Sequence, residues 1–425
     1  MPENKNNPDI EVSHGANGID STILANLAKE YGTPLLVMSE NRLIDNYQRL
    51  ESAFKKNYGN IAIKYAIKAN SNPAIIRTLS GLGAGMDASS VPEIEIALGA
   101  GVDRNRIMFS PNYASRSELE FALNAGLVIN FDDIGQFRML SDIGVPDCVS
   151  FRLNPGFGKG EFPGITLSGP ESKFGIPTSH ILEAYKAAKD SGVKRFGMHM
   201  MCGSNVLDAE YFAIITSKIL DSAGALKSKL GITPEFIDIG GGFGVPYKPE
   251  EKPLDIQKTA ELVSREFKEK SEKYGLGGLQ LMMEPGRYIV ADTTVLLGTV
   301  NYIKEYEKMF IGTDIGMNLL LRPALYGAYH DISVITKPGA KASITADVVG
   351  EVCENTDAIA RNRMLPRVSA GDIISVANSG AYVYGMSSQY NGRPRPAEVM
   401  VKSDGNTVLI RRRETTKDLL STTVI

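Results

Sequence analysis

A lysine that directly follows an apolar run has the clearest chemical potential in this sequence. Lys68 stands in the string Tyr65–Asn70, at the end of a segment whose composition is that of a buried strand. An amine that is desolvated at such a position can form a Schiff base with a carbonyl compound. A lysine can equally lay its stem along the surface and keep its amine in water, as Lys64 could. The position of Lys68 alone does not decide between these interpretations.

A glycine run, Gly240–Gly244, could bind a phosphate group. Successive glycines let backbone N–H groups approach an anion because no Cβ atom stands in the way. We expect Gly241, Gly242 and Gly244 to serve in this way. Such a run is often only a tight turn, but this one follows the seventh of eight apolar segments, where phosphate sites recur in barrel proteins.

The string Glu284–Arg287 offers a carboxylate and a guanidinium after the eighth apolar segment. Glu284 could keep a pyridine nitrogen protonated, which would make that ring an electron sink. Arg287, which follows Gly286, supplies a planar fork for a phosphate or a carboxylate. The alternative is a buried salt bridge at a domain boundary.

Two further pairs lie later in the chain. Arg322 and Tyr326 could together bind a carboxylate, although Arg322 could also be an ordinary surface arginine. Cys353 and Glu354 are adjacent, so a strand would direct them to opposite faces whereas a turn could present both. A buried structural thiol is the commoner fate of a residue such as Cys353.

These residues need elements that position them, and the segment 35–286 alternates short apolar runs with helical patterns. The runs are Ile61–Ala69, Ala84–Ser89, Arg106–Ser110, Leu127–Phe131, Cys148–Asn154, Arg195–Met201, Glu235–Gly240 and Leu279–Glu284. The helical patterns include Val91–Ala100, Ser115–Ala125, Ser179–Ser191 and Ala209–Leu230. Runs of this kind are typical of parallel strands buried on both faces. Eight strand–helix units predict a (β/α)8 barrel, ahead of an open doubly wound sheet, because polar or glycine-rich residues follow many strand ends.

After residue 287 the helical patterns disappear, and extended segments separated by turns indicate a mainly β domain. These segments are Thr293–Tyr306, Ser343–Gly350, Asp372–Ala377 and Glu398–Arg411. We therefore predict a barrel domain over 35–290 and a β-rich domain formed by 1–34 and 291–425.

Composition narrows the class of protein. The net charge is −3 with both signs dispersed, which argues against a nucleic-acid or membrane partner. No apolar run approaches a membrane span, and Met1–Gly15 lacks the apolar core of a signal peptide. Three dispersed cysteines form no CxxC pair, so neither a disulfide framework nor a metal site is indicated. An odd number of thiols suits a reducing cytoplasm.

Six motifs together resemble the fold-type III pyridoxal-phosphate (PLP) decarboxylases, the group that acts on diaminopimelate, ornithine and arginine. They are Tyr65–Asn70, His199–Ser204, Gly240–Gly244, Glu284–Arg287, Cys353–Asp357 and Gly380–Tyr382, in the family's order and spacing over nearly the whole chain. The strings 317–329 and 390–396 favour the diaminopimelate branch. The resemblance implies an alanine racemase-like TIM barrel with a β domain. It also implies decarboxylation of meso-2,6-diaminopimelate to L-lysine, the last step of lysine biosynthesis.

For the cofactor, the resemblance implies that Lys68 carries PLP and that Asp87 lies beside it. Glu284 would pair with the pyridine nitrogen. The phosphate would be bound by Ser204, the Gly240–Gly244 loop and Tyr382. Gly286 and Arg287 would line the same site.

For the substrate, the resemblance implies that Arg287, Arg322 and Tyr326 hold the distal carboxylate. It also implies a homodimer with shared active sites. Cys353 would come from the partner subunit as a candidate proton donor, and Glu354 from the same partner as a substrate contact. Tyr382 would also touch the substrate.

Two departures from the family pattern stand out. The family has a histidine that stacks on the cofactor ring where this chain has Met201, and usually a serine where this chain has Asn355. A thioether can pack on an aromatic face but cannot donate a hydrogen bond. The alternatives left open are a decarboxylase of ornithine, lysine or a specialised precursor, an amino-acid racemase, and a non-catalytic PLP-binding protein.

Overall fold

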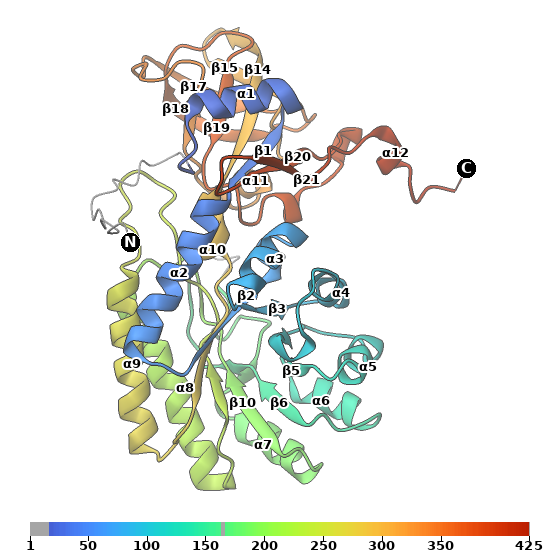
Figure 1. Cartoon of the computed structure of the whole chain (residues 1–425), viewed down its shortest axis with the longest axis vertical. Coiled ribbons are helices and arrows are strands. Elements are labelled where there is room, and N and C mark those ends of the chain that lie inside the picture. Colours follow the sequence, from blue (N-terminus) through green and yellow to red (C-terminus); the bar gives the residue numbers. More distant parts are fainter. Residues whose placement is uncertain (1–16, 163–165, 425) are drawn as a thin grey trace.

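Eight parallel strands close into a barrel in the computed structural model, which describes residues 17–162 and 166–424 (Figure 1). The prediction for Met1–Gly15 lies outside the described residues. In barrel order the strands run β10-β12-β13-β2-β3-β4-β5-β6. Their bounds are β2 Ile61–Ala66, β3 Gly85–Ala88, β4 Ile107–Phe109, β5 Val128–Phe131, β6 Cys148–Phe151, β10 Arg195–His199, β12 Phe236–Asp238 and β13 Gln280–Met283. The predicted strands and barrel are confirmed, and the open sheet is wrong.

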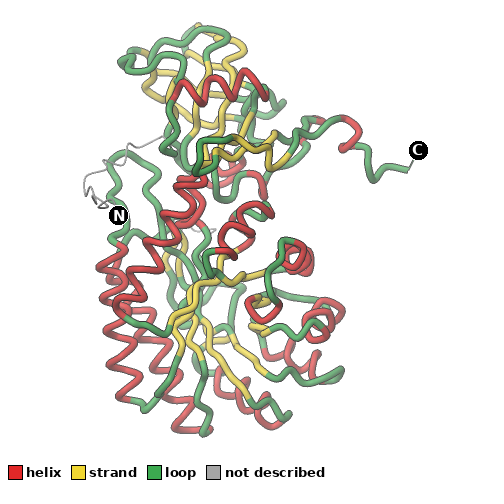
Figure 2. The backbone as a smooth tube through the Cα atoms, in the orientation of Figure 1, coloured by secondary structure: helices red, strands yellow, loops and turns green. Residues whose placement is uncertain are grey.

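Helices surround these strands, which lie inside the ring of helices (Figure 2). They are α2 Glu40–Asn57, α3 Pro73–Gly81, α4 Val91–Gly99, α5 Arg116–Asn124, α6 Ile134–Ser141, α7 Ile181–Asp190, α8 Ala209–Leu230 and α9 Ile256–Lys273. The start of α5 is fixed by a capping box, in which the Ser115 and Glu118 side chains satisfy each other's backbone N–H groups. At the end of α8, Gly231 takes the left-handed conformation with φ 64° that favours glycine.

The C-terminal strands form a nine-stranded sheet above the barrel (Figure 1). Its members are β1 Leu35–Ser39, β14 Thr294–Glu305, β15 Met309–Thr313, β16 Ile332–Val334, β17 Ile344–Val349, β18 Ala358–Leu365, β19 Ile373–Val376, β20 Ala397–Val401 and β21 Thr407–Arg411. Strand β1 runs antiparallel to β14 and parallel to β20. Hydrogen bonding thus places 35–39 in the second sheet, while the predicted division into domains stays a prediction.

Short elements connect these layers. They are α1 Ser21–Tyr31, β7 Leu153–Asn154, β8 Lys159–Gly160, β9 Ile176–Pro177, β11 Gly203–Ser204, α10 Arg287–Val290, α11 Leu321–Tyr326 and α12 Thr416–Leu419. Helix α1 buries Leu24 and Leu27 against Val295 and Val399 of the second sheet. None of the helices within 17–162 and 166–424 is both long and apolar enough to cross a membrane.

The barrel interior is polar where the alternation of side chains directs charged residues inward. On β2, Ile63 and Tyr65 belong to the apolar core shared with the helices, and Lys64 between them points the other way. Lys64 is only 8% exposed and its Nζ donates to the Arg106 carbonyl at 3.3 Å. Desolvation lowers the pKa of Lys64, although Asp238 and Glu284 oppose that shift. The surface position considered for Lys64 is therefore wrong.

We expect Gly380→Ala to destabilise the protein, because a Cβ atom there would lie 1.8 Å from the backbone oxygen of Val290. Backbone cannot swing aside as a side chain can, so the cost should be about 1–3 kcal/mol of unfolding free energy. Chemical denaturation would measure it.

Gly99→Ala is the matched control, because nothing lies within 4 Å of a Cβ atom placed on that residue of α4. The control should be neutral or stabilising by about 0.5 kcal/mol. Equal effects of the two substitutions would contradict the packing argument.

Candidate active site

Lys68 and Asp87 form an ion pair at the carboxyl ends of β2 and β3, with 3.1 Å between Nζ and Oδ2. Asp87 is fully buried, whereas the Lys68 side chain is 43% exposed. Desolvation acts to lower the pKa of Lys68, but the Asp87 and Glu284 carboxylates outweigh it and raise that pKa. Burial and the Glu284 charge raise the pKa of Asp87 in turn. The pair thus holds an accessible amine at a fixed point.

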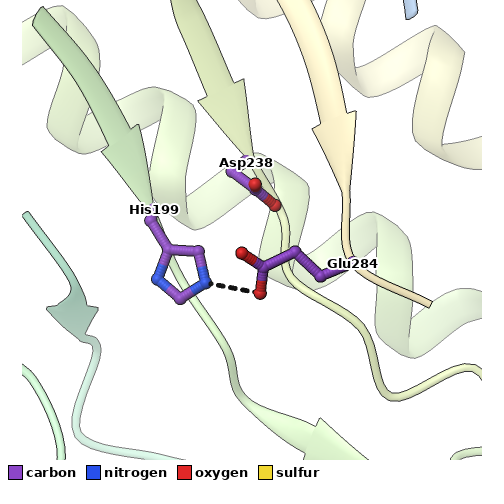
Figure 3. Close-up of side chains that lie close together, drawn as sticks. All are labelled: His199, Asp238 and Glu284. Atoms are coloured by element: carbon purple, nitrogen blue, oxygen red, sulfur yellow. Dashed lines mark hydrogen bonds and ion pairs between the residues drawn. The ribbon is translucent and has the colours of Figure 1, made fainter. Parts of the chain in front are cut away.

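His199, Asp238 and Glu284 point toward one another from the ends of three neighbouring strands (Figure 3). His199 Nε2 and Glu284 Oε2 are 3.2 Å apart, and all three residues are buried. Although burial acts to raise it, His199, Lys68 and other nearby groups lower the pKa of Glu284 to about 2, so it is a carboxylate at neutral pH. Burial and the Glu284 charge raise the pKa of Asp238 well above its usual range.

This triplet leaves acceptors free. Glu284 Oε1 and Asp238 Oδ2 have no hydrogen-bond partner among the described residues. The ligand atoms of the three residues lie within 4.8 Å of one another, which would suit one cation. A protonated group that donates to Glu284 would satisfy the same buried oxygen, because a carboxylate has several acceptor positions.

The glycine loop lies against neighbouring backbone, which explains its residue type. A Cβ atom on Gly241 would stand 2.3 Å from the Glu284 carbonyl oxygen, and one on Gly242 would stand 2.6 Å from that of Gly203. Within the described chain, the N–H groups of Gly242 and Phe243 make no hydrogen bond to another residue. Such N–H groups are suited to an anion. Gly244 is similarly crowded, with a Cβ position 2.8 Å from the Val206 carbonyl oxygen.

Ser204 and Met201 lie beside this loop. Ser204 is half-buried in β11, which pairs with β8. Met201 Sδ accepts a hydrogen bond from the Gly241 N–H at 3.1 Å. The structure therefore places the half-buried Met201 side chain directly on the glycine loop, between the predicted phosphate site and Glu284.

Arg287 and Arg322 both contact Tyr247. Arg287 NH1 donates to the Tyr247 hydroxyl at 2.6 Å, and the Arg322 guanidinium lies 4.4 Å from the centre of the Tyr247 ring. Both arginines are buried. Arg287 also lies 4.8 Å from the ring centre of Tyr382. The surface position considered for Arg322 is wrong, because its side chain is only 2% exposed.

Tyr382 links Arg287 to the segment that carries Lys68. Its N–H donates to the Ala69 carbonyl at 2.9 Å, one residue from Lys68. A Cβ atom on Gly286 would lie 3.4 Å from the Tyr382 hydroxyl and 3.0 Å from the Ala69 methyl, so these segments meet closely. Tyr382 adopts a positive φ of 58°.

His330 forms a hydrogen bond with Arg322. Its Nε2 lies 2.9 Å from Arg322 NH1 and its Nδ1 lies 2.8 Å from the Ala377 carbonyl oxygen. Burial and the positive charge of Arg322 lower the pKa of His330 to about 3, so the ring is neutral. Tyr326, at the end of α11, stacks on Phe162 at 5.8 Å between ring centres.

Cys353 and Glu354 contact neither Lys68 nor the arginine pair in the described part of this chain. Both are exposed, so a buried structural role for Cys353 is wrong. Asn391 accepts from the Cys353 N–H at 2.9 Å and donates to its Sγ at 3.1 Å. The Tyr390 hydroxyl donates to Glu354 at 2.7 Å.

His199, Asp238, Tyr247 and His330 belong to the site but carry no role predicted from the sequence. His199 and Asp238 end barrel strands, so a search for polar residues at strand ends would have found them. Tyr247 and His330 lie in connecting loops, where no local pattern distinguishes them.

His330→Gln should weaken the pH dependence of stability. The folded pKa of about 3 lies below the ordinary value of 6.5, so the unfolded chain binds a proton that the folded chain refuses. Wild-type stability relative to the variant should therefore fall by about 2 kcal/mol between pH 7 and pH 5. Denaturation of both proteins at each pH would measure this difference. A difference that stays constant across this range would show that His330 takes up a proton in the folded protein.

Comparisons with known proteins agree with this geometry. Residues 44–291 match the family described as pyridoxal-dependent decarboxylase, pyridoxal binding domain. Diaminopimelate decarboxylase from Methanothermobacter thermautotrophicus is 46% identical over 415 residues and the match covers 97% of each chain. Its counterpart from Thermoplasma acidophilum is 41% identical, with 98% of this chain and 99% of the relative covered.

A solved structure shows the same architecture. Diaminopimelate decarboxylase from Helicobacter pylori, complexed with L-lysine, superposes with a TM-score of 0.86 at 33% identity. The match covers 94% of this chain and 98% of that one. This chain therefore belongs to the diaminopimelate decarboxylase family of pyridoxal-dependent decarboxylases.

Proposed function

We propose that this carboxy-lyase converts meso-2,6-diaminopimelate to L-lysine and CO2, the last step of lysine biosynthesis. The observation that carries the proposal is that Tyr382, whose N–H bonds the residue after Lys68, packs on the buried Arg287, which shares Tyr247 with the buried Arg322. The names of the full-length relatives support the same substrate. The dispersed, odd number of thiols fits a cytoplasmic reaction.

PLP is the cofactor of this enzyme, and the residues present fit it. Lys68 offers an exposed amine, Glu284 Oε1 is a buried acceptor without a partner among the described residues, and the glycine loop has free N–H groups. When bound, PLP supplies a pyridine ring that takes up the electron pair left behind by CO2.

Each residue near the ring has a distinct task. Lys68 would hold the cofactor through its side-chain amine. Asp87 orients the Lys68 amine through their 3.1 Å ion pair. Glu284 would keep the ring nitrogen protonated, and its low pKa of about 2 suits that task because the carboxylate stays ionised at neutral pH. His199 fixes one oxygen of Glu284 and leaves the other for the ring nitrogen.

Phosphate binding falls to the glycine loop with Ser204 and Tyr382. Gly241, Gly242 and Gly244 permit the close approach, and the unpaired N–H groups of that loop supply donors. Met201, whose Sδ bonds the Gly241 N–H, would offer the cofactor ring a thioether instead of an imidazole.

The distal carboxylate of the substrate is bound by Arg287 and Arg322, with Tyr326 at the rim. Arg322 has its closest carboxylate partner among the described residues, Glu161, at 4.0 Å, so a substrate carboxylate would satisfy a group that is otherwise poorly paired. A substrate that lacks this carboxylate would leave buried guanidiniums unpaired, which penalises its binding strongly.

Decarboxylation of ornithine or lysine is the second candidate, and Glu161 is the observation in its favour. A distal ammonium needs an acidic partner, and Glu161 stands near the arginine pair, held by Asn205 at 2.9 Å. The two guanidiniums would repel that ammonium, however, so diaminopimelate remains the better fit.

The active site is completed by a partner subunit in a homodimer. Cys353 and Glu354 are exposed and lie in a turn clasped by Tyr390 and Asn391. From the partner, Cys353 returns a proton to Cα after CO2 has left, and Glu354 contacts the substrate. In this arrangement Cys353 and Glu354 have a function in the dimer that they do not have in the single chain.

Purified holoenzyme should release CO2 from meso-diaminopimelate far faster than from ornithine, lysine or arginine. Lys68→Ala should lower kcat about a thousandfold or more and remove the absorbance of the lysine-bound cofactor.

The control is Lys186→Ala, because Lys186 is exposed on α7. Lys64 is not a suitable control residue, because it is buried in the barrel. Turnover of ornithine but not of diaminopimelate would establish the second candidate.

Mixing two inactive variants tests the shared active site. Lys68→Ala and Cys353→Ala homodimers should each be inactive, while an equal mixture should recover about one quarter of wild-type activity. Random pairing makes half the dimers mixed, and each mixed dimer has one complete site. A mixture as inactive as its parents, with subunit exchange confirmed by mass spectrometry, would show that each site is built within one chain.

A further inference from the structure

His330 is fully buried in the loop between α11 and β16, and its ring packs edge-on against that of Tyr247, with 5.2 Å between the ring centres. The proposed mechanism gives it no task. It bonds two groups of different kinds, the Arg322 guanidinium and the backbone carbonyl of Ala377.

These two partners fix the tautomer of the ring. A carbonyl oxygen only accepts, so Nδ1 must carry the hydrogen that it donates to Ala377 at 2.8 Å. A guanidinium only donates, so Nε2 must present its lone pair to Arg322 NH1 at 2.9 Å. A neutral imidazole meets both demands at once, and burial beside Arg322 keeps it neutral.

Arg322 has few other restraints. His330 is the one hydrogen-bond acceptor of its guanidinium within the described residues, and Glu161 lies at 4.0 Å. The face of Tyr247 confines the guanidinium plane without binding any N–H group. The remaining N–H groups are therefore free for a carboxylate, and the direction in which they point depends on His330.

We propose that His330 is a positioning residue that orients the Arg322 fork toward the distal carboxylate of the substrate. The inference rests on the proposed function, in which Arg322 binds that carboxylate. Without the Nε2 acceptor, the guanidinium would turn to satisfy the freed N–H, with Glu161 as a carboxylate within reach. The fork would then be lost even though the arginine and its charge remain.

Two substitutions separate positioning from simple packing. His330→Gln places an amide oxygen where Nε2 stands and keeps an acceptor for Arg322. His330→Asn keeps a donor for Ala377 but is too short to reach Arg322. Both remove the ring, so a purely structural role would make them fail alike.

Equilibrium binding to the holoenzyme is the main measurement, with L-lysine as a ligand that has the carboxylate and 1,5-diaminopentane as one that lacks it. His330→Asn should weaken L-lysine binding about tenfold or more and leave 1,5-diaminopentane binding unchanged. His330→Gln should stay within about threefold of wild type for both ligands. With diaminopimelate, His330→Asn should raise KM by a larger factor than it lowers kcat.

A double-mutant cycle tests the route of the effect. In an Arg322→Lys background, which keeps the charge but loses the fork, His330→Asn should add little to the loss of L-lysine affinity. Additive losses would overturn the inference. Should His330→Asn fail to fold, His330→Phe replaces it, because it keeps a ring of similar size and lacks both polar atoms.

The results distinguish a failure of the proposed role of His330 from a failure of the proposed function. If wild type prefers L-lysine over 1,5-diaminopentane and His330→Asn keeps that preference, His330 does not position Arg322 and the inference alone fails. If wild type itself shows no preference, the proposed carboxylate site fails and the inference falls with it.

Discussion

Charge buried inside the barrel is the constraint on which the active site depends. Asp87, Asp238 and Glu284 bring three carboxyl groups into one enclosed space, where an uncompensated charge would cost several kcal/mol. Lys68 compensates Asp87 directly, and His199 pairs with Glu284. Asp238 is held toward its neutral form by its neighbours. Removal of any one charge would therefore alter the protonation of the others, and the site titrates as a unit.

The architecture could be predicted from the sequence because local patterns of apolar and polar residues indicate most of its strands and helices. The eight apolar runs and the helical patterns between them correspond to observed strands and helices. The loss of helical patterns after residue 287 corresponds to the strands of the second sheet. The pairing of β1 with β14 and β20 joins segments hundreds of residues apart, and no local pattern encodes it. The two-residue strands β7, β8, β9 and β11 are likewise too short to leave a period.

The site was only partly predictable for a related reason. Lys68, Glu284 and the glycine run stand in distinctive strings, whereas His330 gains its importance from a carbonyl 47 residues away. Lys64 was misjudged as a possible surface residue because a charged side chain inside a barrel contradicts the usual preference. Lys64 can be buried because the closed barrel brings the carboxyl groups of Asp87, Asp238 and Glu284 near it.

Several hydrogen bonds join the barrel to the C-terminal part of the chain. Asn70 donates to the Gly380 carbonyl at 3.1 Å and Asn378 donates to that of Pro246 at 2.9 Å. Asn72 reaches Glu398 at 2.7 Å across the same junction. Lys68 follows barrel strand β2 and Arg322 lies in α11 of the C-terminal part, so relative movement of the two parts would separate these side chains.

The positive φ of Tyr382 has a consequence for stability. A tyrosine in the left-handed region stores about 1–2 kcal/mol of backbone strain, which glycine would not. The chain retains the tyrosine at the point where its N–H bonds Ala69 and its ring covers Arg287. Backbone strain and side-chain packing are therefore opposed at this residue. Glycine would relieve that strain but would also remove the ring that packs on Arg287, so the strained backbone persists where the side chain makes this contact.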